Sequence, residues 1–153
     1  MERVHPASER GVTLLEMLIV VTLIALLAGI TFPSVAAGLD SLRLRSAADS
    51  IVAFLNTALD RAERRQQAVE IRISAKENGL SARSADAGFA RDLHLPDNVR
   101  ISNPAEPRRF LLYPGGAVPA ISIEVATGNG RRRLVAIDPI TGVPRSEPVG
   151  AKP

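Results

Sequence analysis

A long apolar run lies near the N-terminus of the chain. From Val12 to Phe32 the sequence reads VTLLEMLIVVTLIALLAGITF, with a single charged residue, Glu16, and no proline. A helix of this length, rising ~1.5 Å per residue, spans about 31 Å, which is roughly the hydrocarbon thickness of a bilayer. A buried core helix is the alternative, but such helices are usually shorter and have a polar face. We therefore expect residues 12–32 to form a transmembrane helix.

Beyond Pro33, apolar residues recur at three- and four-residue spacing, and polar residues lie between them. The apolar positions are Leu44, Ala48, Ile51, Leu55, Ala58, Leu59 and Ala62. This spacing predicts an amphipathic helix over residues 33–68, with a break near Pro33 because proline removes a backbone donor. The stripe suits either a coiled-coil seam or the face of a helix that packs on its own sheet, and we favour the sheet.

After Gln67 the pattern changes to short segments typical of strands. The expected strands are 69–73, 80–83, 99–102, 110–113, 120–126 and 134–137. Asn129-Gly130 suits a tight hairpin turn. Residues 84–98 are expected to form a loop, and the tail after Gly142 to fray. A long N-terminal helix packed on an antiparallel β-rich globular domain, residues 69–153, is an α+β fold.

Charge is distributed unevenly along the chain. There are 17 Arg and 2 Lys against 16 acidic residues, and no Cys, which excludes disulfides and thiolate metal sites. Basic and acidic residues balance over 39–98, with nine of each, whereas residues 99–153 hold eight basic and four acidic residues. The excess lies around Arg131, Arg132 and Arg133, which we expect to project from the tip of a hairpin, and around Arg145. Such guanidinium groups suit DNA phosphates or acidic neighbouring subunits.

The chain carries no pattern typical of catalysis. Beyond residue 11 the one histidine is His94, and a single histidine with Asp92 nearby is usually a surface residue rather than half of a triad. The acids are scattered singly, which argues against a metal cage. We therefore expect no enzymatic activity, no metal and no cofactor.

Glu16 is the unusual residue of the apolar run. A carboxylate at the centre of a membrane segment costs about 2.5–3.5 kcal/mol, and less near an end. If the chain were cut after Gly11, Val12 would carry a free α-amino group, with which the Glu16 of a neighbouring copy could pair. The alternative is an acid that reaches water near the headgroups. The residues alone favour neither.

The segment Gly11-Val12-Thr13-Leu14-Leu15-Glu16, followed by the apolar run, resembles the class III signal of type IV pilins and pseudopilins. The resemblance implies that a prepilin peptidase cuts between Gly11 and Val12 and methylates Val12, and that Glu16 guides filament assembly. Val12 departs from the phenylalanine that is usual in the family.

The second half of the chain resembles the GspH/FimT class of minor pseudopilins. The resemblance is carried by the helix 46–67, the strand 69–74 and the pattern Phe110…Pro114-Gly115-Gly116…Val135-Ala136-Ile137…Thr141-Gly142. The chain lacks both the acidic calcium loop of major pseudopilins and the cysteines with which many major pilins form a C-terminal disulfide. Both absences favour a minor subunit with a pilin-like fold.

The resemblance implies a structural minor pseudopilin of a type II protein secretion system. It further implies that the cytoplasmic leader, residues 1–11, is removed and that a single helix spans the inner membrane with its N-terminus cytoplasmic. The C-terminal domain would lie in the periplasm and join a short pseudopilus. The implied partners are prepilin peptidase, other pseudopilins or pilins through the N-terminal helix, and secreted cargo.

The alternative is a FimT-like minor type IV pilin that binds DNA during uptake. Residues 130–133 have the letters of the Gly-Arg-x-Arg signature of those subunits, but they precede the expected strand 134–137. After that strand, where the signature is expected, only Arg145 remains. The secretion pseudopilin is therefore the favoured interpretation.

Overall fold

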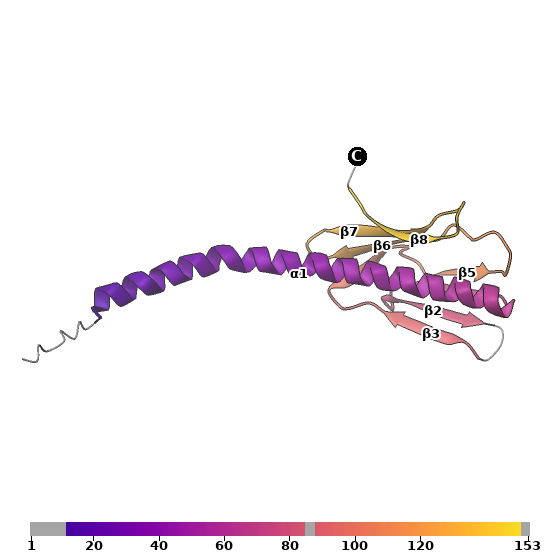
Figure 1. Ribbon diagram of the computed structural model, residues 1–153, viewed down its shortest axis with the longest axis horizontal. Coiled ribbons are helices and arrows are strands. Elements are labelled where there is room, and N and C mark those ends of the chain that lie inside the picture. The colour runs from indigo at the N-terminus through magenta and orange to yellow at the C-terminus, as the bar shows by residue number, and fades with distance from the viewer. Residues whose placement is uncertain (1–11, 85–87, 151–153) are drawn as a thin grey trace, which may run out of the picture. The chain divides into compact units, whose positions relative to one another are not determined.

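The computed structural model describes residues 12–84 and 88–150, without the side chains of residues 32–34, 36 and 37. Within these residues one helix, α1 (Leu14–Arg65), is followed by eight strands (Figure 1). The chain divides into two compact units, one up to Gly38 and one from Leu39 onward, and α1 contributes residues to both. The expected leader, residues 1–11, lies outside the described residues.

The strands form two four-stranded sheets in which all neighbours are antiparallel. Sheet A has the order β3-β2-β1-β5, and sheet B has the order β4-β6-β7-β8. The strands of sheet A are β1 (Val69–Ser74), β2 (Gly79–Ser84), β3 (Ala90–His94) and β5 (Arg108–Leu112). Those of sheet B are β4 (Val99–Asn103), β6 (Ser122–Thr127), β7 (Arg132–Ile137) and β8 (Pro144–Pro148). The predicted α+β class is confirmed.

Two strands lie where the sequence predicts none. Strand β3 falls inside the expected loop 84–98, and β8 falls inside the expected frayed tail. Both are edge strands. Strand β3 lacks a clear alternation of buried and exposed residues, and β8 begins and ends with proline, which sheets tolerate at their edges. Sequence patterns written for half-buried inner strands therefore miss both.

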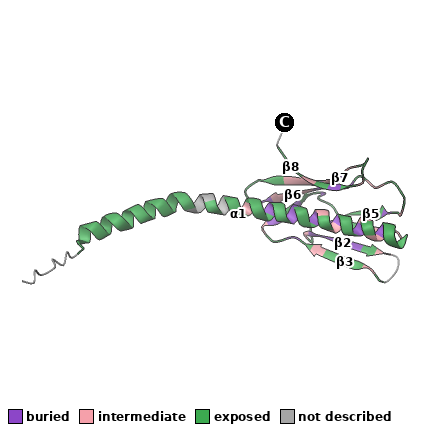
Figure 2. Cartoon of the chain, viewed as in Figure 1, coloured by how far each residue is buried: buried purple, intermediate pink, exposed green. Residues whose placement is uncertain are grey.

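The amphipathic part of α1 packs on its own sheets, as the sequence predicts. Its buried apolar residues are Leu44, Ala47, Ala48, Ile51, Leu55, Ala58 and Ala62. Four of these seven are alanines, which allow the helix backbone to approach the sheets closely. They form one cluster with inward-facing residues of both sheets, such as Ile71 on β1 and Val135 on β7. Figure 2 shows this buried stripe along the second half of the helix.

The break that the sequence predicts near Pro33 is absent from α1, and a local hydrogen-bond motif ends the helix at its C-terminus. Helix α1 continues through residue 33. At the C-terminus Gln66 adopts a positive φ of 51°, the N–H of Gln67 donates to Ala62 O at 3.2 Å and the N–H of Gln66 donates to Glu63 O at 3.4 Å. This pair of bonds is a Schellman motif, in which glutamine takes the position usual for glycine.

Asn78 connects the two sheets. It lies in the turn between β1 and β2 with φ of 48°. Its side-chain amide donates to Val99 O at 2.8 Å and accepts from the N–H of Ile101 at 3.1 Å. Strand β4 pairs with β6 on its other side, so the Asn78 amide takes the place of a neighbouring peptide group on the free edge of sheet B.

Candidate functional site

Thr13 caps the N-terminus of α1. The N–H of Glu16 donates to the Thr13 hydroxyl at 3.2 Å, and the N–H of Met17 donates to Thr13 O at 3.2 Å. Residues 13–16 thus have the capping-box pattern, a threonine or serine followed three residues later by glutamate or glutamine. The cap fixes where the helix begins. It places Glu16 in the first turn, where the helix dipole stabilises negative charge.

The expected processing residues lie just before this cap. Gly11 is outside the described residues, whereas Val12 directly precedes the capping threonine and is 61% exposed. The Glu16 side chain is exposed and makes no ion pair with any residue that the structure describes. Its carboxylate is therefore accessible to a group on another molecule.

The helix that follows suits a bilayer. Leu14–Thr31 is the one segment, in the described part of the chain, that is long and apolar enough to cross a membrane, and none of it is buried. The hydroxyls of Thr22 and Thr31 donate to the carbonyls of Leu18 and Leu27 at 2.7 and 2.8 Å. These bonds satisfy two polar groups that hydrocarbon would leave unpaired. The segment is consistent with a single-pass membrane anchor.

The candidate contact arginines lie around the β6–β7 hairpin, whose tip is tied to α1. Gly130 supplies the positive φ of 83° that the turn requires. The Asn129 amide donates to Asp40 Oδ2 at 3.0 Å, and Arg131 donates to the Ser41 hydroxyl at 2.6 Å. Arg131 is therefore exposed but engaged with the helix.

The three consecutive arginines do not project together. Arg132 is exposed and lies 3.4 Å from Glu124 on β6. Arg133 is half-buried and donates to both the carbonyl and the hydroxyl of Ser146 on β8, at 3.3 and 3.2 Å. The expectation of a shared exposed tip is therefore wrong for Arg133. Strand β7 begins at Arg132, and successive side chains of a strand point to opposite faces.

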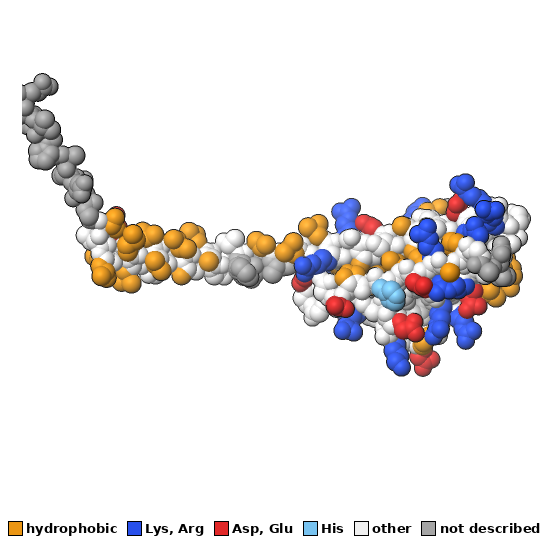
Figure 3. All heavy atoms as spheres, turned by 90° about the horizontal axis from the view of Figure 1, so that it is seen from below, with side chains coloured by type: hydrophobic (Ala, Val, Ile, Leu, Met, Phe, Trp, Pro, Cys, Tyr) orange, Lys and Arg blue, Asp and Glu red, His pale blue; other side chains and the backbone are white. Residues whose placement is uncertain are grey.

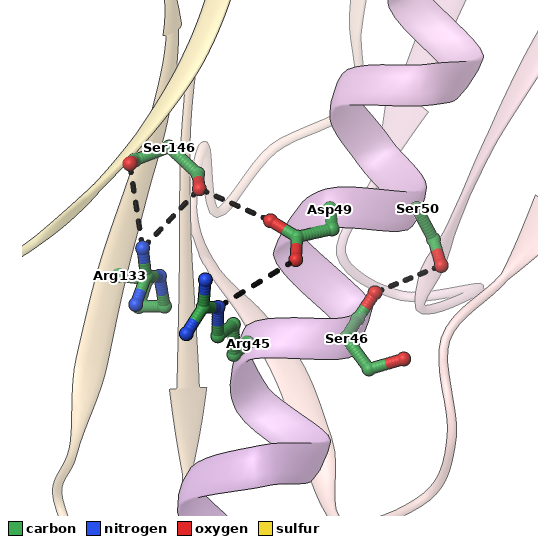
Figure 4. A network of polar contacts seen from close by, with 6 residues as sticks. All are labelled: Arg45, Ser46, Asp49, Ser50, Arg133 and Ser146. Atoms are coloured by element: carbon green, nitrogen blue, oxygen red, sulfur yellow. Dashed lines mark hydrogen bonds and ion pairs between the residues drawn. The ribbon is translucent and has the colours of Figure 1, made fainter.

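Arg133 belongs to a polar network between sheet B and α1 (Figure 4). The Ser146 hydroxyl, which accepts from Arg133, donates to Asp49 Oδ1 at 3.3 Å. Asp49 Oδ2 in turn lies 3.9 Å from Nε of Arg45, which is one turn earlier in the helix. The network links β7, β8 and α1, so Arg133 has a structural role here.

Two of the candidate arginines, Arg132 and Arg145, lie on the outer face of sheet B, as does Arg100, which the sequence analysis does not single out. Arg100 on β4 and Arg132 on β7 lie opposite the same residue of β6, Ala126. Arg145 on β8 lies opposite Ala136 and is exposed. The structure thus places Arg132 and Arg145 on one face and directs Arg131 and Arg133 toward the helix.

His94 ends β3 at the edge of sheet A and is exposed. In the described residues no group of three His, Cys, Asp or Glu side chains is arranged to hold a metal ion.

Among the carboxyl groups that the structure describes, Asp138 is the one with an altered pKa. The backbone N–H groups of Thr141 and Ile140 donate to it in the β7–β8 turn and lower its pKa. These hydrogen bonds stabilise the turn and do not indicate a reactive site.

The N-terminal residues match a known family model. The model described as the prokaryotic N-terminal methylation motif matches residues 6–32. The match includes Gly11, Val12 and Glu16 together with the apolar helix. No curated protein matches the sequence.

The fold is similar to that of a solved pseudopilin. The structure of the minor pseudopilin EpsH from the Type 2 Secretion System of Vibrio cholerae matches with a TM-score of 0.57. The alignment covers 71% of this chain and 98% of the EpsH chain at 14% sequence identity. At this identity the likeness establishes the fold. The resemblance to type IV pilin-like minor pseudopilins is therefore confirmed in the N-terminal motif and in the fold.

Proposed function

We propose that the chain is a minor subunit of a filament of a type II secretion system. The proposal rests on one observation: the methylation motif and a fold similar to that of a minor pseudopilin occur together in one chain. The motif alone would suit any prepilin, and the fold alone would not predict processing. The function that follows is structural rather than enzymatic.

Processing is the first step of the proposed function. Prepilin peptidase cuts between Gly11 and Val12, removes residues 1–11 and methylates the new amino group on Val12. The chain then stays in the inner membrane through residues 12–32, with the β-rich domain, residues 69–153, in the periplasm. These roles are supported by the motif match and by the apolar helix.

Assembly is the second step, and Glu16 is its central residue. Inside a filament core the Glu16 carboxylate pairs with the amino terminus of a neighbouring subunit, so that each charge offsets the burial cost of the other. The exposed side chains of Leu14–Thr31 pack against the N-terminal helices of other pseudopilins. Prepilin peptidase and these subunits are the proposed partners, and the periplasmic domain is the part that meets secreted cargo.

The test replaces Glu16 and follows incorporation into filaments isolated from secreting cells. Glu16→Gln removes the charge but keeps the capping-box pattern, because glutamine also serves in that position. We expect Glu16→Gln and Glu16→Ala to abolish incorporation alike. Thr13→Val, which weakens the cap but keeps the carboxylate, is the matched control and is expected to assemble. Normal incorporation of Glu16→Gln would refute the charge-pairing role.

DNA uptake by a FimT-like pilin is the second candidate function. The exposed arginines on the outer face of sheet B, Arg100, Arg132 and Arg145, are the observation in its favour. The engagement of Arg131 with Ser41 weakens it. Titration of labelled duplex DNA into the full chain in non-ionic detergent, at low and physiological salt, separates the two functions. We expect no binding that depends on Arg132 and Arg145.

A further inference from the structure

Two neighbouring hollows lie beside the C-terminal part of α1, next to the edge strand β3. The first, of ≈ 210 Å³, is lined among others by Phe54, Thr57, Phe89, Arg91, Asp92 and Leu93. The second, of ≈ 450 Å³, is lined among others by Thr57, Asp60, Phe89 and four arginines, Arg61, Arg64, Arg65 and Arg91. They share Thr57, Phe89 and Arg91. We call the two hollows together the α1–β3 furrow.

The end of the furrow near the C-terminus of α1 is strongly basic. Four arginines line it, and one acid, Asp60, is paired with Arg64 at 2.6 Å. Arg61, Arg65 and Arg91 have no carboxylate partner among the residues that the structure describes. Figure 3 shows basic side chains gathered at this end of the globular unit.

Arg61 lies against an aromatic ring of the furrow. Its guanidinium carbon lies 5.2 Å from the centroid of the Phe89 ring, and its Nε is buried without a hydrogen-bond partner among the described residues. The cation–π contact favours this position of the positive charge. The furrow therefore contains a pre-positioned cation beside two exposed ones, on Arg65 and Arg91.

The other end of the furrow is more apolar. Phe54, Phe89 and Leu93 are half-buried there and pack against the core cluster. Within the residues that the structure describes, β3 is an edge strand of sheet A. A ligand that fills the whole furrow must therefore present an apolar group next to negative charge.

We propose that the α1–β3 furrow docks an extended segment of a neighbouring filament subunit that carries carboxylates next to an apolar side chain. The apolar side chain occupies the hollow beside Phe54 and Leu93, and the carboxylates pair with Arg65 and Arg91. Charge complementarity at the basic end is the argument for an acidic segment. The identity of the partner as a subunit rests on the proposed function, whereas the binding chemistry does not.

A protein segment fits this furrow better than a nucleic acid does. DNA phosphates would use the arginines but leave the apolar hollow empty. Unpaired bases need a free aromatic face, and Arg61 already covers a face of the Phe89 ring. The segment chemistry uses both ends of the furrow.

The test uses the full chain in non-ionic detergent micelles and fluorescence anisotropy. The probes are short fluorescein-labelled peptides in which glutamates follow a leucine at varied spacing, matched peptides with glutamine for glutamate or serine for leucine, and a labelled DNA duplex. We expect saturable binding of at least one glutamate–leucine peptide and weaker binding of both matched peptides.

Three variants test the location of binding. Arg65→Ala with Arg91→Ala is expected to weaken peptide binding roughly tenfold, since each removes an exposed charge pair. Thr57→Glu, at the junction of the two hollows, should weaken it further. The matched control, Arg108→Ala with Arg109→Ala, removes the same charge from exposed residues of β5 and should leave binding unchanged.

Several results would overturn the proposal. They are no saturable binding of any glutamate–leucine peptide, an equal loss in the β5 control, or binding of the DNA duplex that depends on Arg65 and Arg91 while the peptides fail. Failure of the proposed function is a separate result, since it is measured by processing at Gly11. If the chain is not processed but binds the peptide, the binding chemistry proposed for the furrow stands and the proposed function as a filament subunit fails.

Discussion

The polar link between the two sheets at Asn78 gives the sharpest stability prediction. Its amide donates to Val99 O at 2.8 Å and accepts from the N–H of Ile101 at 3.1 Å, and both of these residues are buried. Its backbone has φ of 48°, a conformation that asparagine tolerates better than most other non-glycine residues. Replacing Asn78 therefore perturbs two separable quantities, the hydrogen bonds and the backbone strain.

Asn78→Gly removes the side-chain bonds without adding strain. It leaves a part-buried carbonyl and a part-buried N–H without the partners they have now, and a fully buried group left unsatisfied costs about 1–3 kcal/mol. Partial access of water to the edge of β4 lowers the sum, so we expect a loss of about 2–3 kcal/mol in the free energy of unfolding. Asn78→Ala adds about 1 kcal/mol more, because alanine pays for the left-handed backbone.

The assay is thermal unfolding of the full chain in non-ionic detergent, followed by circular dichroism in the β-sheet region. For a unit of this size each kcal/mol lowers Tm by roughly 4 °C, so Asn78→Gly should unfold about 10 °C below the parent chain. Asn78→Asp keeps the acceptor for Ile101 but turns an oxygen toward Val99 O, and should be no more stable than Asn78→Gly. If Asn78→Gly unfolds within 2 °C or so of the parent, the amide does not hold the sheets together and the reasoning is refuted.

Three further predictions follow from the structure. Leu55→Ala should lower the free energy of unfolding by about 2–5 kcal/mol, because Leu55 is fully buried. Leu42→Ala, on the exposed side of the same helix, should change it by less than about 0.5 kcal/mol. Equal losses for the two variants in urea unfolding would contradict the assigned core. Asp138 has a pKa lowered by the backbone N–H groups that donate to it, so its stabilisation is full above its unfolded pKa of about 3.9 and is lost as pH falls through the folded value. The Tm difference between the parent and Asp138→Asn should therefore shrink below about pH 4, and a constant difference would contradict this. Arg131→Ala should leave the fold intact but increase amide hydrogen exchange at the β6–β7 tip, because it removes the hydrogen bond to Ser41. Unchanged exchange would show that this bond does not stabilise the tip.

The sequence predicts the elements whose residues alternate with a clear period. The helical stripe through Leu44, Ile51 and Leu55 is buried as expected, because a 3.6-residue period places those side chains on one face. Strand β1 is likewise predicted, because Val69, Ile71 and Ile73 alternate with polar residues. Strand β3 shows no clear alternation of buried and exposed residues, and β8 begins and ends with proline, so neither has the pattern that predicts a strand.

For the candidate contact arginines, closeness in sequence does not predict closeness in the fold. Arg131, Arg132 and Arg133 are adjacent in sequence, but β7 begins at Arg132 and sends neighbours to opposite faces. Conversely, Arg61 and Arg91 lie far apart in sequence and in a stretch whose charges balance overall. The packing of β3 beside α1 brings them to one furrow. Net charge over a stretch therefore gives no guide to charge on a surface.

The processing of the N-terminus tests the central claim most directly. The measurement is mass spectrometry of the N-terminal peptide of the chain recovered from membranes of cells with an active prepilin peptidase. The proposed function predicts a chain that begins at Val12 with a methylated amino group, and an unprocessed chain when Gly11 is replaced by Ala. A parent chain that keeps Met1–Gly11 in those cells, with no shorter form, would contradict the assignment as a pseudopilin.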